Sequence, residues 1–261
     1  MPAALAANSI WFYHGAPAFS PDGLEMFFVR YPTNQTDPME IDVMRLVDNR
    51  WTEPQRAPFS SELHETNPVF SHDGNRLYYV SERQEDRYKL VMRSGDGWSN
   101  PQSVSVPFVS SALRGWQLSV TSEETFVFEL DVDGHYDLYC SRLVDGAYTV
   151  PESLGDRVNS AYNDFAPFIH PEEDYIIFTS QRPGGLGASD LYISFKDSEG
   201  TWTPAANMGS PINSNGTDAW PYLSPDGEYF FFVTSRQGDA GYNPYWVDAR
   251  IIEELRLVQT R

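Results

Sequence analysis

Short apolar stretches alternate with polar turns along the whole chain, and this alternation repeats five times at intervals near fifty residues. Each copy has an apolar stretch, a turn resembling Ser-Pro-Asp-Gly, an aromatic stretch and a polar loop. The copies are anchored at Pro17, Pro68, Gln117, Pro167 and Pro221. The steps between anchors are 51, 49, 50 and 54 residues. A repeat of this length built from strands and turns is typical of the blades of a β-propeller.

The second repeat predicts four strands. They cover Pro68–Ser71, Arg76–Ser81, Tyr88–Arg93 and a last strand that runs from Gly97 past Pro101 to Val106. The Asp-Gly pair between the first two strands tolerates the left-handed conformation that a tight hairpin requires. Because proline lacks a backbone donor, Pro101 belongs on an edge strand, which is the outermost strand of a blade.

An aromatic residue followed by proline marks this outermost strand in four repeats, and the fifth repeat ends without it. The four pairs are Trp51/Pro54, Trp98/Pro101, Tyr148/Pro151 and Trp202/Pro204. Pro2–Ser9 resembles the segment that begins at Pro204. Pro2 also precedes the anchor Pro17 by about as many residues as Pro204 precedes the anchor Pro221. We therefore expect the N-terminal segment to supply the outer strand of the last blade and close the ring.

The fold class predicted is all-β, a five-bladed β-propeller of four-stranded blades that forms a single domain over residues 1–261. The approximate blades are 14–58, 65–108, 114–160, 164–214, and 218–250 together with 2–9. A short terminal helix is expected at Ala249–Arg256, where apolar residues have helical spacing.

The fourth repeat, over Ile176–Ser194, resembles the WD-like repeats of TolB-type β-propellers, as do the turns Ser20–Gly23 and Ser224–Gly227. The resemblance covers nearly the whole chain, and the third repeat departs most because Thr121–Glu124 replaces Ser-Pro-Asp-Gly. It implies the fold. It leaves the function open, since such propellers include protein-docking modules, sensor domains and enzymes.

The chain is strongly acidic, with a net charge of −19 from 37 acidic and 18 basic residues. This charge repels phosphate backbones and anionic lipid, so neither nucleic-acid binding nor membrane insertion is expected. Cys140 is the only cysteine, which excludes an intrachain disulfide. A soluble monomer is expected, and the compartment stays open between the cytoplasm and, after removal of a leader, the periplasm or the exterior.

Candidate site residues precede the first strand of each repeat, which in a propeller runs beside the central channel. The residues three positions ahead of the anchors are all ionisable, namely His14, Glu65, Arg114, Asp164 and Asp218. The residues one position ahead include Trp116 and Trp220 and are expected on the same strand face, because side chains alternate. Together these seven residues predict a site for a small polar ligand, such as a sugar. The alternative is that the charges solvate the channel or pair with each other.

Two functions follow from this candidate site. The leading hypothesis is a binding module for a protein or a small polar ligand, since no catalytic motif such as Gly-x-Ser-x-Gly occurs. The alternative is a carbohydrate-active enzyme, a hydrolase or lyase, with Glu65, Asp164 and Asp218 as candidate catalytic carboxylates. An assembly role through the outer loops is a third class.

No cofactor and no metal site is predicted, because neither His-x-x-x-His nor Cys-x-x-Cys occurs. A channel Ca²⁺ held by Asp164, Asp218 and Glu65 remains an alternative.

Arginine and aspartate also recur once per repeat. Arg83, Arg182 and Arg236 end second strands, and Asp42, Asp137 and Asp190 lie on third strands, with Asn243 at the matching place. We expect them to form structural pairs that fix the intervening loop. The glycines of Pro183–Gly187 follow a strand but open no helix, so they do not predict a phosphate-binding loop.

Overall fold

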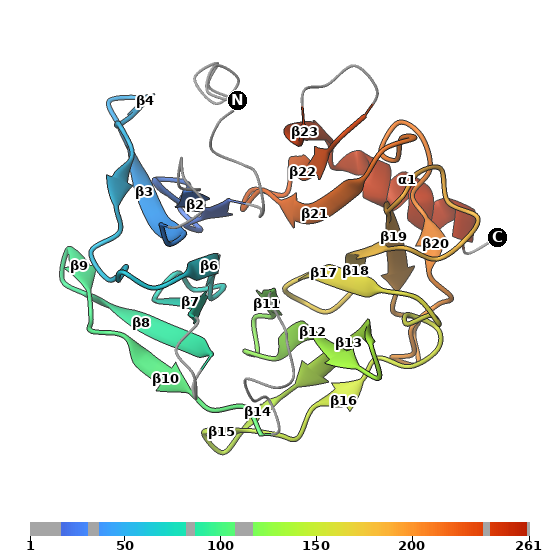
Figure 1. Ribbon diagram of the computed structural model, residues 1–261, viewed down its shortest axis with the longest axis horizontal. Coiled ribbons are helices and arrows are strands. Elements are labelled where there is room, and N and C mark those ends of the chain that lie inside the picture. The colour runs from blue at the N-terminus through green and yellow to red at the C-terminus, as the bar shows by residue number, and fades with distance from the viewer. Residues whose placement is uncertain (1–16, 31–36, 82–86, 108–116, 237–240, 260–261) are drawn as a thin grey trace.

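Five antiparallel sheets are arranged in a ring around a central axis (Figure 1). The computed structural model describes residues 17–30, 37–81, 87–107, 117–236 and 241–259. The five-bladed β-propeller predicted from the repeat is therefore confirmed. In the described part of the chain no helix has the length and apolar character needed to cross a membrane.

Each blade is built from strands that follow one another outward from the axis. The first contains β1 (Ala18–Phe19), β2 (Glu25–Arg30), β3 (Glu40–Val47), β4 (Arg50–Trp51) and β5 (Gln55–Arg56). The second contains β6 (Glu65–Phe70), β7 (Arg76–Ser81), β8 (Tyr88–Ser94), β9 (Gly97–Trp98) and β10 (Gln102–Val104). The third contains β11 (Leu118–Val120), β12 (Phe126–Val132), β13 (His135–Ser141), β14 (Leu143–Val144), β15 (Ala147–Tyr148) and β16 (Glu152–Ser153).

The fourth blade contains β17 (Asp164–Ile169), β18 (Tyr175–Ser180), β19 (Asp190–Phe195) and β20 (Ala206–Asn207). The fifth contains β21 (Asp218–Leu223), β22 (Tyr229–Thr234) and β23 (Asn243–Asp248) and leads into helix α1 (Arg250–Gln259). The predicted terminal helix is thus confirmed. The prediction that Pro2–Ser9 supplies the outer strand of this blade lies outside the described residues.

The aromatic marker of the outer strand belongs to a separate small hairpin. Trp98 lies in β9, which pairs with the end of β8, and the outermost strand β10 begins only after Pro101. Trp51 and Tyr148 occupy the same place in β4 and β15. The tight turn before each aromatic residue, with Gly95 at φ 59°, folds the chain back before it reaches the blade edge. The expected strand from Gly97 to Val106 is therefore two strands.

The hairpin aromatic of one blade packs against the preceding blade. The Trp98 ring lies 5.9 Å from Phe27 and 6.1 Å from Phe59 of the first blade, measured between ring centroids. The guanidinium of Arg93 covers the Trp98 ring at 4.2 Å. Tyr148 packs into a cluster that includes Tyr78 of the second blade. Each such side chain fills the gap between two sheets.

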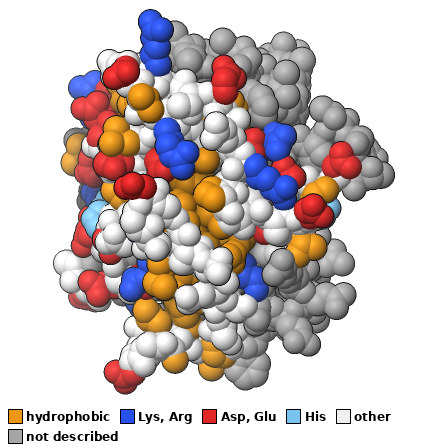
Figure 2. Space-filling model, turned by 90° about the vertical axis from the view of Figure 1, so that its left-hand side faces the viewer, with side chains coloured by type: hydrophobic (Ala, Val, Ile, Leu, Met, Phe, Trp, Pro, Cys, Tyr) orange, Lys and Arg blue, Asp and Glu red, His pale blue; other side chains and the backbone are white. Residues whose placement is uncertain are grey.

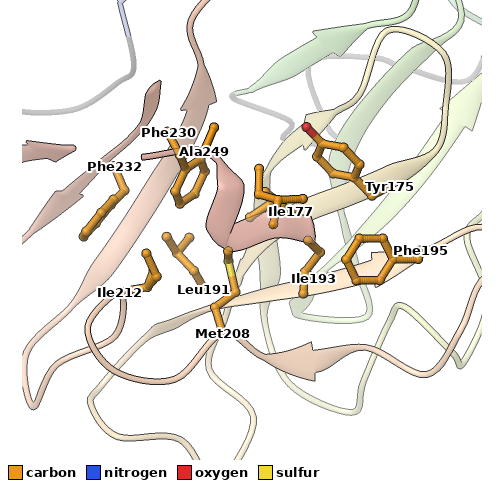
Figure 3. Close-up of a cluster of buried hydrophobic side chains, with 11 residues drawn as sticks. Tyr175, Ile177, Leu191, Ile193, Phe195, Met208, Ile212, Phe230, Phe232 and Ala249 are labelled. Carbon is orange, nitrogen blue, oxygen red and sulfur yellow. The ribbon is translucent and has the colours of Figure 1, made fainter. Parts of the chain in front are cut away.

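Helix α1 fills the corresponding gap between the fourth and fifth blades. Ala249 and Ile252 pack into a buried cluster with Phe230 and Phe232 of β22 and with apolar side chains of β18 and β19 (Figure 3). The guanidinium of Arg256 lies 4.5 Å from the Phe195 ring. Since no hairpin follows β23 in the described residues, the helix supplies the apolar packing that a hairpin supplies elsewhere.

Ion pairs also join neighbouring blades, beside the turns between their first and second strands. Glu25 of the first blade contacts Arg93 of the second, and Arg142 of the third contacts Glu173 of the fourth at 3.2 Å. Figure 2 shows acidic and basic side chains mixed on the side of the molecule that bears the first two blades, with apolar side chains between them. Because partly exposed ion pairs stabilise a fold little, the blades depend chiefly on apolar packing.

The Ser-x-Asp-Gly segments form the predicted turns. The Ser71 hydroxyl donates to Asp73 at 2.6 Å, and Asp73 accepts the N–H of Asn75 at 3.0 Å. Gly74 has φ 70°, a conformation that glycine adopts without strain. These hydrogen bonds favour the ionised carboxylate and lower the pKa of Asp73 to about 2.

Trp98→Ala should lower the free energy of unfolding by about 3 kcal/mol, because it removes a large ring from the gap between two blades. Urea denaturation followed by circular dichroism measures this change. Val47→Ala is the matched control, since Val47 lies on an outer hairpin with 54% of its surface exposed. It should change the free energy by less than about 0.5 kcal/mol. Equal effects of the two substitutions would contradict the packing role of Trp98.

Asp73→Ala should lower the melting temperature at pH 7 by roughly 2–4 °C, because the turn loses its hydrogen-bond acceptor. The folded-state pKa lies below the ordinary value of 3.8 for aspartate, so the carboxylate stabilises the fold above about pH 4. This stabilisation is lost as the pH falls toward 2. The difference in melting temperature between the variant and the unmodified protein should therefore shrink over that range. Asp96→Ala, on an exposed turn, is the control and should leave the melting temperature at pH 7 nearly unchanged.

Candidate functional site

The innermost strands β1, β6, β11, β17 and β21 surround the axis (Figure 1). Among the described residues, the loops that precede β6, β17 and β21 lie at one end of the channel, together with the loop between β18 and β19. The Ser-x-Asp-Gly turns lie at the other end. We call the first end the mouth and the second the turn end.

A bulge interrupts three of these inner strands. The pairing register shifts between Thr66 and Val69 in β6, and β17 and β21 shift at the equivalent place. The residue one position ahead of the anchor has φ near +53°, at Asn67, Ala166 and Trp220. A left-handed residue breaks the alternation of side chains. The expectation that residues one and three positions ahead of the anchor share a face is therefore wrong in these blades.

The three candidate carboxylates all bind the loop that precedes their own strand. Glu65 accepts hydrogen bonds from the Ser61 N–H at 2.8 Å and the Ser61 hydroxyl at 2.7 Å. Asp164 accepts the same pair from Ser160 at 2.6 and 2.7 Å. Asp218 accepts hydrogen bonds from the N–H and the hydroxyl of Ser214. All three carboxylate residues have at most 2% of their surface exposed. The serine four positions earlier is the shared partner.

Two of these carboxylates also bind an arginine. The Arg182 guanidinium lies 2.7 Å from Asp164 Oδ1 and donates to the Val158 carbonyl at 2.6 Å. Arg236 lies 3.7 Å from Asp218 Oδ1. The predicted pairing of Arg182 with Asp190 is therefore wrong, because the arginine side chain turns back toward the loop before its own blade. The prediction for Arg83 lies outside the described residues.

Asp190 instead holds the loop between β18 and β19. It accepts the N–H of Gly187 at 3.1 Å and the amide of Asn207 at 2.9 Å. The glycines of this loop allow close packing: a Cβ on Gly187 would lie 2.0 Å from the carbonyl oxygen of Gly216. The glycine-rich segment therefore packs against the neighbouring loop at the mouth.

A cavity of 360 Å³ opens at the mouth. Its described lining combines side-chain amides, one carboxylate and aromatic rings. The members are Met39, Thr66, Asn67, Gln117, Glu129, Tyr136, Asn163, Phe165, Gln181 and Trp220. Of the seven predicted ligand-binding residues, only Trp220 is among them. Glu65, Asp164 and Asp218 lie at the strand starts described above, and His14, Arg114 and Trp116 lie outside the described residues.

Glu129 is the carboxylate that sequence reasoning missed. Its side chain is 3% exposed, and its two oxygens accept the N–H groups of Gln117 at 3.1 Å and Ala166 at 2.9 Å. Glu129 therefore joins the inner strands of the third and fourth blades beside the bulge. Its position inside an alternating strand gave no signal of this role.

Hydrogen bonds fix the orientation of several amides in the cavity wall. Asn163 accepts the N–H of Tyr136 at 3.0 Å and donates to Gln181 Oε1 at 2.7 Å. Asn67 donates to the Leu118 carbonyl at 3.0 Å. Asn163 and Gln181 each directly precede a recurring residue, Asp164 and Arg182, and this adjacency is the sequence signal that could have found them.

Three polar groups of the lining have no protein partner within the described residues. These are the side-chain amide of Gln117 and the hydroxyls of Thr66 and Tyr136. A wall that combines fixed amides with free polar groups can bind a ligand that both donates and accepts hydrogen bonds. Across the described chain, no group of three or more histidine, cysteine, aspartate or glutamate side chains is placed to hold a metal ion.

Comparison with known proteins extends only to the fold. No protein-family model and no curated protein sequence matches the chain. Among solved structures, TolB from Acinetobacter baumannii superposes with a TM-score of 0.59 at 17% identity, covering 87% of this chain and 51% of TolB. The chain thus spans about half the length of TolB.

Two larger proteins are similar to a lower degree. The hydrazine synthase of Kuenenia stuttgartiensis gives a TM-score of 0.51 at 12% identity, over 94% of this chain and 66% of that one. Prolyl oligopeptidase B from Galerina marginata superposes with a TM-score of 0.51 at 14% identity. The match covers 86% of this chain and 30% of the peptidase. At such identities the likeness shows a shared fold and carries no activity to this chain.

Asp164→Ala should lower the free energy of unfolding by about 3–5 kcal/mol, because it leaves Arg182 without its buried partner and the Ser160 N–H without an acceptor. A double-mutant cycle with Arg182→Ala, measured in urea, should show a coupling energy of at least about 1 kcal/mol. Asp174→Ala is the control, since 58% of that side chain is exposed. A stable Asp164→Ala protein would overturn the loop-holding role.

Proposed function

We propose that this protein is a binding module whose mouth cavity takes a small, neutral, hydroxylated ligand of the sugar class. The observation that supports this most is the composition of the cavity wall, in which four side-chain amides stand beside Trp220, Tyr136 and Phe165. Amides bind hydroxyl groups as donors and acceptors, and ring faces cover the C–H surface of a sugar.

The size and charge of the cavity favour such a ligand. Its 360 Å³ lies at the small end of ligand pockets, which span about 300–1,000 Å³, so it suits one or two sugar units. The net charge of −19 and the buried Glu129 disfavour anionic ligands. Neutral sugars should therefore bind better than uronic acids.

The same wall favours binding over glycoside hydrolysis. Most glycoside hydrolases need two carboxyl groups on either side of the scissile bond. Glu129 is the only carboxylate among the described residues that line the cavity, and both its oxygens accept backbone N–H groups. Glu65, Asp164 and Asp218 are likewise held by their own loops, which leaves no acid–base pair at the cavity among the described residues.

A thermal-shift screen of neutral mono- and disaccharides, with uronic acids for comparison, tests the proposal. A bound sugar raises the melting temperature by mass action. Calorimetry on each hit should then show that Trp220→Ala or Gln117→Ala weakens binding by at least about tenfold.

Gln102→Ala on the exposed strand β10 is the matched control and should leave the affinity unchanged. A panel without any hit, or hits that survive both cavity substitutions, would contradict the proposal. The first outcome would favour the alternative of a protein partner.

A further inference from the structure

A second cavity of 360 Å³ continues along the axis toward the turn end. Inner strands of all five blades line it. The anchor prolines of four blades contribute, together with the rings of Phe19, Phe70 and Phe168. We call it the axial cavity.

The wall of the axial cavity offers few free polar groups. Proline has no backbone donor. The Tyr222 hydroxyl accepts the N–H of Phe19 at 3.0 Å, and the Ser119 hydroxyl accepts that of Ile169 at 3.0 Å. These bonds cross from one blade to the next, so they satisfy these groups of the inner strands and leave a mostly apolar surface toward the axis.

The mouth cavity and the axial cavity adjoin. Asn67, Gln117 and Trp220 line both of them. A group seated among the amides of the mouth therefore lies next to an apolar space of equal volume. One ligand can use both, provided that one of its ends is polar and the other is not.

Negative charge at the turn end restricts which apolar group of a ligand the axial cavity can take. Glu172 and Asp226 lie at this end of the axial cavity. The hydrogen bond from Ser224 lowers the pKa of Asp226, so its carboxylate is charged at neutral pH. A tail that ends in another carboxylate would be repelled there.

We propose that the ligand is an amphipathic glycoside, with its sugar in the mouth cavity and an uncharged aliphatic or aromatic aglycone in the axial cavity. This rests on the proposed function. The proposal specifies the aglycone of the ligand, which the mouth cavity alone does not do, and it assigns a role to the axial cavity.

Calorimetry with methyl, butyl and hexyl β-glucosides and β-galactosides, below their micelle concentrations, tests the proposal. Affinity should rise by about two- to fourfold for each methylene added, since each one buries apolar surface. A hexyl-length aglycone that ends in a carboxylate should bind at least about tenfold more weakly than the hexyl glycoside.

Substitutions test whether the aglycone lies in the axial cavity. Leu223 lines the axial cavity and not the mouth cavity, and Leu223→Trp should fill the axial space and weaken hexyl glycosides while leaving methyl glycosides unchanged. Leu257→Trp, on an exposed position of α1, is the matched control. The chain-length series does not depend on either variant folding.

The outcomes separate the two proposals. Equal affinities for methyl and hexyl glycosides would overturn the amphipathic ligand and leave sugar binding intact. A gain with chain length that Leu223→Trp does not reduce, in a folded variant, would also overturn it. Failure of every glycoside to bind would contradict both.

Discussion

Apolar packing between neighbouring blades is the interaction on which the rest of this structure depends. Each sheet buries both faces against its neighbours, and a side chain such as Trp98 fills the outer part of the gap. At the junction of the fourth and fifth blades Ile252 of α1 takes that place. The ion pairs beside the turns, such as Arg142 with Glu173, are partly exposed and contribute little to holding the sheets together.

Once the blades are fixed, the inner strands must satisfy their backbone groups around a narrow axis. They do so across blades: Tyr222 accepts from Phe19, and Glu129 accepts from Ala166. The bulge at residues such as Trp220 frees backbone groups and turns side chains toward the axis. The polar mouth and the apolar channel beyond it are both consequences of how these strands complete their hydrogen bonds.

The fold could be predicted from the sequence because its signals are local. Anchor prolines and Asp-Gly turns, as at Gly74, recur at a fixed interval, and each one dictates a nearby backbone conformation. The candidate site could not be predicted, because strict alternation was assumed through Ala166 and Trp220. Neither alanine nor tryptophan signals a positive φ, and that conformation decides which side chain faces the cavity. The serine four residues before Asp164 did carry information, since it is the partner that the carboxylate binds.

Helix α1 also has a consequence for how such a ring could be lengthened or shortened. A repeat unit inserted after the second blade would bring its own hairpin, and the aromatic side chain of that hairpin would fill the new junction with the second blade. A unit inserted after the fourth blade would fill its junction with that blade in the same way, but α1 would then pack against the new unit, and the contact between Phe195 and Arg256 would be lost. The junctions are therefore not interchangeable, because a unit placed before the fifth blade must present the apolar surface that α1 covers, whereas a unit placed elsewhere must match only hairpin side chains.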